Sequence, residues 1–400
     1  MNQHGFRADA VIIGGGIHGA GCAQALAARG YSTVLIESNQ IGHGTSRRSS
    51  KLIHGGLRYI ETGQFSLVRK SLRERATLEK IAPGLIHRRK FLLPVYRRNR
   101  LKSWQLILAL YTYAFLGGLG KKTRFKRLSK TQMLPLSGLK QDDLIAVFQY
   151  WDSQTDDLAL TQAVTLSAKN HHCQVFEKTE FMAAHQSSKG MIKVQAVNHK
   201  KNIAIDCRLL INAAGPWVEK VQSRIDFVEQ GPQISLVQGT HIEYDQTISD
   251  DIFYLESPDD HRPVFIMPWQ GGTLIGTTEI QHHGSPANSR PSEAEVKYLA
   301  AVLFHYFPTY QGNFIRAWSG LRVLPKQDKR ARIRQFAKQP RDTILHIDNQ
   351  QAPRVISIYG GKLTTYRATA KKVAKLAEKT LGKAKMTGDT SLIQLHSWNK

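Results

Sequence analysis

Cysteine is scarce in this chain of 400 residues, and the arrangements that cysteines usually support are missing. Cys22, Cys173 and Cys207 are odd in number, widely spaced and never part of a CxxC pair. This pattern excludes a disulfide framework and the usual zinc spacings, so we expect a reducing compartment and no metal site. The first apolar strand begins within ten residues of the start, so we expect no signal peptide. We therefore expect a protein of the cytoplasm or of the cytoplasmic face of a membrane.

Acidic residues are also few, since 31 aspartates and glutamates stand against 56 lysines and arginines, a formal net charge of +25. So basic a chain favours an anionic partner: a nucleic acid, a membrane surface or a substrate. No aromatic-interleaved basic repeat or helix-turn-helix pattern is present, so we expect no nucleic-acid partner. A single substrate site needs only a few cations, whereas attraction to an anionic membrane would explain the whole excess.

Long hydrophobic runs are absent as well. The apolar stretch 104–118 is too short and too polar to span a bilayer. It predicts a helix with Trp104, Ile107, Leu108, Tyr111 and Phe115 on one face, and basic clusters precede and follow it. Two interpretations remain open: a core helix with solvated basic flanks, or an interfacial helix lying on anionic lipid. The net charge favours the second.

The start of the chain carries a strand–turn–helix–strand pattern. Residues 10–13 form an apolar run that leads into Gly14-x-Gly16-x-x-Gly19 and an alanine-rich helix, and a second strand ends in Glu37. In this context the three glycines allow a tight turn, close approach of a pyrophosphate and close helix–strand packing. The helix N-terminus favours the phosphates, and Glu37 suits a ribose, so we expect a dinucleotide, FAD or NAD rather than NADP.

The order of the remaining elements predicts a mixed α/β (α+β) fold. We expect a Rossmann-like domain assembled from discontinuous segments, 1–90, 150–225 and 315–382. A mostly antiparallel β domain for substrate or membrane contact, 91–149 and 226–314, is inserted between them. Residues 383–400 are expected to form a poorly packed tail.

Glycine-rich turns elsewhere place candidate chemistry near this domain. A second turn, Gly360-Gly361-Lys362, opens the last helix; alone it is typical of an ordinary helix start, but with the first turn it suits FAD, which is held from several sides. Arg58, Arg322 and Lys362 each follow or enter such a turn and are candidates for binding an anionic substrate. His54 and His241 are the candidates for taking a hydroxyl proton.

Several stretches, in order along nearly the whole chain, resemble the signature of the respiratory, FAD-dependent glycerol-3-phosphate dehydrogenases. They are residues 49–59 (SSKLIHGGLRY), 212–217 (NAAGPW), 239–241 (GTH), 268–269 with 275–279 (PW, IGTTE), 319–322 (SGLR) and 360–367 (GGKLTTYR). The resemblance implies oxidation of sn-glycerol 3-phosphate to dihydroxyacetone phosphate, with electrons passed to quinone. It implies attachment to the cytoplasmic face of the inner membrane, which favours the interfacial interpretation of 104–118. A homodimer is compatible with it.

The resemblance also implies roles for residues. Arg322, His54, His241 and Lys362 are the candidates for catalysis. The substrate would be surrounded by Arg58, Tyr59, Arg322, Lys362, Thr364 and Arg341. FAD would be held by Gly14, Gly15, Gly16, Ile17, His18, Gly19, Glu37, Thr45, Ser46, Ser50, Lys51, Leu52, His54, Phe181, Ala214, Gly215, Gly361, Lys362, Leu363 and Thr364.

The chain departs from the family pattern in three places. It ends soon after the last helix, where members usually continue into a C-terminal helical domain. Arg341 matches a further substrate-side arginine only if the following loop is slightly shortened, and Arg47-Arg48 stands where small residues are usual. Two other functions stay open: an oxidase or dehydrogenase of another small anion, such as a 2-hydroxy acid or amino acid, that uses O₂, and a non-catalytic flavin-binding partner at the membrane.

Overall fold

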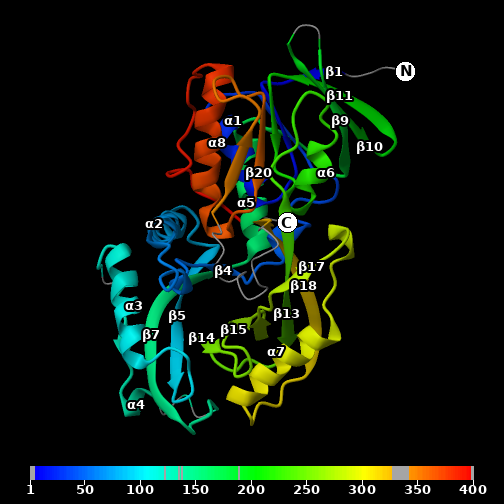
Figure 1. Ribbon diagram of the computed structural model, residues 1–400. Helices are drawn as coiled ribbons and strands as arrows, with labels where there is room; N and C mark the ends of the chain where they lie inside the picture. The colour runs from blue at the N-terminus through cyan, green and yellow to red at the C-terminus, as the bar shows by residue number, and fades with distance from the viewer. Residues whose placement is uncertain are drawn as a thin grey trace.

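The computed structural model describes residues 5–120, 123–133, 136, 138–187, 190–326 and 342–397. Three sheets divide these residues into two lobes, drawn in the upper and lower halves of Figure 1. The predicted mixed α/β fold with a Rossmann-like part built from discontinuous segments is confirmed.

The central sheet has six strands, all parallel except β19 at one edge. Its order is β19 (Ile344–Ile347), β20 (Val355–Tyr359), β12 (Leu209–Asn212), β2 (Ala10–Ile13), β3 (Thr33–Ile36) and β8 (Gln174–Phe176). Most of these strands read as short continuous apolar runs, because both faces of the sheet are covered.

Helices cover one face of the central sheet and a second sheet covers the other. The helices are α1 (Ile17–Ala27), α5 (Asp157–Asn170) and α8 (Tyr366–Leu381). The small sheet on the opposite face comprises β1 (Gly5–Arg7), β11 (Lys201–Cys207), β10 (Ile192–Asn198) and β9 (Thr179–Gln186). The short helix α6 (Val218–Gln222) packs beside it. The strand pattern did not separate this small sheet from the central one.

The large sheet forms the other lobe and is mostly antiparallel, as predicted. Its order is β17 (Ile280–His282), β13 (Ile234–Tyr244), β16 (Gly272–Gly276), β15 (Pro263–Trp269), β14 (Ile252–Glu256), β5 (Ile86–Tyr96), β7 (Leu144–Thr155) and β4 (Leu52–Ile53), with β18 (Phe314–Pro325) on β13 and β6 (Lys126–Arg127) on β7. Since β18 and all of β7 pair here, the sheets divide the chain at different points from the expected boundaries at 150 and 315.

Successive residues of β5 show how the large sheet is packed. Phe91 and Leu93 join the cluster under α2 (Phe65–Ile81) and α3 (Ser103–Leu116), whereas Leu92 joins the cluster under α7 (Glu293–Tyr306). Alternate side chains of a strand point to opposite faces, so both faces of this strand are buried. Ser292 and Glu295 form a capping box at the start of α7.

Most described residues of the expected tail, from 383 onward, are exposed, but the segment is anchored by specific contacts. Leu395 is 4% exposed, and its backbone N–H donates to the carbonyl of Ile81 over 2.6 Å. The backbone of Thr387 likewise donates to Ala28. One buried leucine and these backbone bonds fix a segment whose polar composition gave no such signal. None of the described helices has the length and apolar character needed to cross a bilayer.

Candidate active site

A cavity of about 960 Å³ lies between the two lobes, at the carboxyl ends of the parallel strands. Gly14 follows β2, Glu37 follows β3, Ala213 follows β12 and Gly360 follows β20, and all four line it. Ligands of open α/β sheets bind at this edge, because the loops and helix N-termini meet there. The volume is at the upper end of the usual range for ligand pockets, roughly 300–1,000 Å³, and suits an extended ligand.

The first glycine-rich turn forms one wall of the cavity and is tightly packed from behind. Gly14 has φ +102°, and a Cβ there would come within 2.7 Å of the Ala213 carbonyl oxygen. A Cβ on Gly19 would lie 1.8 Å from the Gly14 oxygen. Gly16, Ile17 and His18, at the start of α1, line the cavity in front of this turn. The turn therefore admits only glycine and presents a helix N-terminus, which suits a pyrophosphate.

Glu37 and Phe181 line the same end of the cavity. The Glu37 carboxylate accepts hydrogen bonds from the backbone N–H groups of Gly15 (2.6 Å) and Asn39 (2.8 Å), which fix it at the end of β3. This arrangement suits a ribose hydroxyl. The residues present therefore fit the nucleotide half of FAD.

The other predicted cofactor residues fall into two groups. Thr45, Ser46, Ser50, Leu52, Ala214, Gly215, Gly361, Leu363 and Thr364 line the cavity. Lys51 lies behind its wall instead: its Nζ donates to Asp157 Oδ1 and to the Arg47 carbonyl, each over 2.7 Å, and the residue is 6% exposed. Lys51 precedes β4 and has a left-handed backbone conformation (φ +58°), and its buried ion pair with Asp157 supports the loop. Gly15 and Gly19 also support the turn without lining the cavity.

The three candidate cations converge at the opposite end, although they come from different elements. Arg58 lies in the single turn η2 (Leu57–Tyr59), Arg322 in β18 and Lys362 just after β20, and all line the cavity. Lys362 Nζ lies 3.7 Å from the centroid of the Tyr59 ring. Arg322 donates to Thr277 Oγ1 over 3.3 Å. Arg341, the further candidate, lies outside the described residues.

Glu279 lies between two of these cations and was not singled out as a site residue from the sequence. Its Oε1 is 3.5 Å from Nη1 of both Arg58 and Arg322, and the residue is 7% exposed. The shared carboxylate offsets the repulsion between the two guanidinium groups. Its place in the stretch 275–279 was the only sequence feature that pointed to the site. Charge alone does not predict a carboxylate next to a binding site for an anion.

The two candidate histidines also line this end. His241 is buried, stacked on Trp318 with 4.3 Å between ring centroids, and its Nε2 lies 3.0 Å from Ser50 Oγ. Burial, and then the charges of Arg322 and Lys51, hold the pKa of His241 well below its usual value. The imidazole is therefore neutral at pH 7, although the same shift makes it a weaker base than a solvated imidazole. His54 contacts the edge of Phe265 and is held through its backbone N–H by Thr364 Oγ1 (3.2 Å).

Aromatic side chains that the sequence did not mark complete this end of the cavity. Tyr150, Tyr254 and Phe265 come from three strands of the large sheet and line the cavity opposite the turns. Their positions depend on which strands pair, which a single sequence does not specify. They make a low-dielectric wall, in which the attraction between a bound anion and the cations is strengthened.

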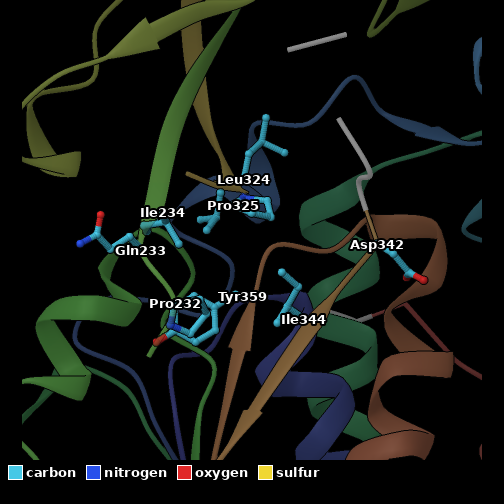
Figure 2. Close-up of a pocket in the computed structure, with 9 residues that line it drawn as sticks. Pro232, Gln233, Ile234, Leu324, Pro325, Asp342, Ile344 and Tyr359 are labelled. Carbon is cyan, nitrogen blue, oxygen red and sulfur yellow. The ribbon is translucent and has the colours of Figure 1, made fainter. Parts of the chain in front are cut away.

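A second cavity, at the junction of the large and central sheets, is too small to hold a ligand. It measures about 10 Å³, about the volume that one water requires, and is lined mostly by apolar side chains, with Gln233, Asp342 and Tyr359. Figure 2 shows the Asp342 carboxylate pointing away from Ile344 and Tyr359. Asp342 pairs instead with Lys70 over 2.9 Å.

Comparison with known proteins gives a consistent result. The family model described as FAD dependent oxidoreductase matches residues 9–376. A glycerol-3-phosphate dehydrogenase of Pseudomonas aeruginosa is 34% identical over 93% of this chain and 70% of its own length. A D-erythritol 1-phosphate dehydrogenase of Brucella abortus is 32% identical over 91% of this chain and 72% of its length. The structure of glycerol-3-phosphate dehydrogenase from Bacillus halodurans complexed with FAD superposes with a TM-score of 0.74, at 26% identity over 97% of this chain and 68% of that one.

Proposed function

Because the chain belongs to the family of FAD-dependent oxidoreductases, we propose that it oxidises sn-glycerol 3-phosphate to dihydroxyacetone phosphate. FAD is the cofactor of this enzyme family and, when bound, supplies the acceptor for the hydride that leaves the substrate carbon. The residues of the first turn, Glu37 and the loops at 45–52, 214–215 and 361–364 would hold FAD along the cavity. Its reactive ring would then lie toward the cations at the far end.

The cluster of cations is the observation that carries this proposal. Arg58, Arg322 and Lys362 carry three positive charges and Glu279 one negative charge, so the cluster has a formal net charge of +2. A phosphate monoester carries about −1.5 to −2 at pH 7, which matches this charge better than a carboxylate does. Guanidinium groups also bind phosphate oxygens bidentately. The substrate class that fits is therefore a small phosphorylated alcohol.

The proton of the substrate hydroxyl needs an acceptor on the protein as the hydride leaves. His241 is neutral and lines the cavity near Arg322, and His54 lines it near Thr364. Either imidazole would take this proton, and a cation beside the hydroxyl oxygen would stabilise the negative charge that develops there. We assign Lys362 that second role and the two arginines the phosphate.

A longer phosphorylated polyol is the second candidate substrate. The relative named D-erythritol 1-phosphate dehydrogenase is 32% identical, close to the value for the glycerol-3-phosphate enzymes. Both compounds carry a phosphate and a neighbouring hydroxyl group, so the same residues could bind and oxidise either one. Turnover of the purified protein with each compound, with a soluble quinone as acceptor and the carbonyl product assayed, decides between them. We expect the higher kcat/KM with glycerol 3-phosphate; a higher value with erythritol phosphate would overturn the substrate assignment alone.

We further propose that the electron acceptor is a membrane quinone and that the protein lies on the cytoplasmic face of the inner membrane. The surface of α3 supports this. Trp104, Leu108, Tyr111 and Phe115 are each more than 60% exposed on α3, whereas Leu110 and Tyr113 face the core. A helix with one buried and one exposed apolar side, flanked by basic segments at 97–102 and 124–127, is suited to lie in an anionic interface.

The alternative acceptor, O₂, is tested in the same turnover assay. If quinone is the acceptor, product forms in the absence of O₂ as fast as in air, and hydrogen peroxide stays far below the amount of product. Peroxide equal to product, with no turnover on quinone, would instead make the protein an oxidase.

A further inference from the structure

Glu74 and Arg75 are consecutive charged residues of α2, and both are buried. Through Arg367 and Asp152 they contact the loops that form the wall of the cavity. Glu74 is 7% exposed and Arg75 is 2% exposed, and neither lines the cavity. Charged side chains are costly to bury unless they are fully paired. The rest of the buried face of α2 is largely apolar, with Leu67, Val68 and Leu72 packed on the large sheet. Packing alone therefore does not explain the two charges.

Glu74 holds the loop that carries Lys362. Its two carboxylate oxygens accept hydrogen bonds from Nε (2.9 Å) and Nη2 (2.8 Å) of Arg367, which is also buried. Arg367 is the second residue of α8, and the short turn η7 (Leu363–Thr365) connects it to Lys362. A bidentate pair fixes orientation as well as distance. It ties the start of α8, and with it this loop, to α2.

Arg75 holds the other loop through Asp152. Its Nη1 donates to Asp152 Oδ1 and, over 2.8 Å, to the Trp151 carbonyl. The second Asp152 oxygen accepts from the Tyr113 hydroxyl (2.6 Å). The backbone N–H of Gly55 donates to this hydroxyl (2.9 Å) and to Asp152 Oδ1 (3.3 Å). Gly55 lies between His54 and Arg58, so the pair anchors the loop that carries both.

The two loops meet in front of α2, where the His54 N–H donates to Thr364 Oγ1 over 3.2 Å. We propose that Glu74 and Arg75 are positioning residues that set the spacing between the Arg58 loop and the Lys362 loop. This rests on the proposed function, in which both loops hold one phosphorylated substrate. The pair acts through Arg367 and Asp152 and does not touch the substrate.

The test compares Glu74→Gln with Glu378→Gln as a matched control. Glu378 lies on α8, pairs with Arg29 over 3.3 Å and does not line the cavity. For each holoenzyme we would measure FAD content, the thermal unfolding midpoint, the affinity for inorganic phosphate from the flavin spectrum, and the rate constant of anaerobic flavin reduction at saturating substrate. We expect Glu74→Gln to keep FAD and to lose at least tenfold in that rate constant, while Glu378→Gln keeps it.

An unchanged reduction rate and phosphate affinity in Glu74→Gln would overturn the proposal. If this variant fails to fold or to keep FAD, Arg75→Lys is tested by the same measurements and decides the matter, since it retains the charge and loses the fixed geometry. A loss of rate only in proportion to lost FAD would assign the pair a structural role. Failure of the substrate assignment is distinguishable, because the wild-type protein itself would then not respond to glycerol 3-phosphate.

Discussion

At the scale of single residues, the proposed site is defined by half-buried cations that share a buried carboxylate. Arg58 and Arg322 come from different elements and reach the same oxygen of Glu279, at 3.5 Å each. This contact holds each guanidinium group near the cavity before any substrate binds. Less side-chain entropy is therefore lost on binding. The consequence is that removal of one arginine should affect the substrate much more than the cofactor.

Arg322→Ala is therefore expected to lower kcat/KM for glycerol 3-phosphate by roughly 100-fold, equivalent to about 2.7 kcal/mol, because a bidentate phosphate contact is lost. The FAD content of the purified protein should remain that of the wild type. Arg316→Ala is the control, since Arg316 lies on the same strand but pairs with Glu243 and does not line the cavity. Equal losses in the two variants would contradict the role of Arg322.

His18 provides a test of electrostatics in the cofactor turn. Burial, and then the charge of Lys70, lower the pKa of His18 to about 4, and neither ring nitrogen has a hydrogen-bond partner among the described residues. The unfolded chain, with a histidine pKa near 6.5, binds this proton more readily. The contribution of neutral His18 to the free energy of unfolding is therefore fully present above about pH 6.5. It decreases as the pH falls toward 4.

When the pH is lowered from 7 to 5, we expect the free energy of unfolding to decrease less in His18→Asn than in the wild type. The predicted difference is about 2 kcal/mol, from a pKa displaced by roughly 2.5 units. Urea unfolding at the two pH values measures it directly. Parallel losses in both proteins would mean that His18 is not the titrating group.

At the scale of elements, the first turn and α1 form a unit whose geometry leaves no space for side chains. Gly19→Ala would place a Cβ 1.8 Å from the Gly14 oxygen, in contact with rigid backbone. We expect a loss of at least 1–3 kcal/mol in unfolding free energy, about the cost of overpacking, together with loss of FAD. Gly84→Ala, where nothing lies within 4 Å of the new Cβ, should retain both. The flavin absorbance per protein and urea unfolding are the measurements.

The helix α3 is the element on which the membrane proposal depends. Leu108→Ser combined with Phe115→Ser removes two of its exposed apolar side chains without touching its buried face. Since burial of each side chain is worth about 1.5–3 kcal/mol, binding to vesicles that contain phosphatidylglycerol should weaken at least tenfold. Turnover with a soluble quinone should be unchanged.

Co-sedimentation with these vesicles measures the effect. Phe304→Ser, which alters an exposed side chain on α7, is the matched control and should bind like the wild type. Binding of the α3 variant at wild-type strength would remove α3 from the membrane proposal.

Much of the fold and of the site was predictable at these two scales, because local patterns determine them. The fingerprint located β2, α1, β3 and Glu37, and the glycine turns located Arg58, Arg322 and Lys362, all of which line the cavity. Lys51 was placed in the cofactor site because a linear pattern does not show that Asp157 faces it. Glu279, Tyr254 and the Glu74–Arg367 pair depend on contacts between distant segments, which a single sequence does not encode in a readable way.

At the scale of the whole molecule, two lobes built on different sheets enclose the large cavity. The central sheet supplies the turns for FAD, and the large sheet supplies the aromatic wall and Arg322. The segments interleave, so that neither lobe is continuous in sequence. In the proposed site a substrate between the lobes would contact loops of both, so the spacing of those loops would affect the chemistry.

The central claim is that a phosphorylated alcohol held by these cations passes its hydride to the bound flavin. Anaerobic mixing of the yellow holoenzyme with glycerol 3-phosphate, followed by its absorbance near 450 nm, tests this most directly; glycerol, which lacks the phosphate, and a 2-hydroxy acid serve as comparisons. We predict rapid bleaching by glycerol 3-phosphate and none by glycerol or the acid. A flavin that stays oxidised with glycerol 3-phosphate, or one that the acid bleaches instead, would contradict the claim.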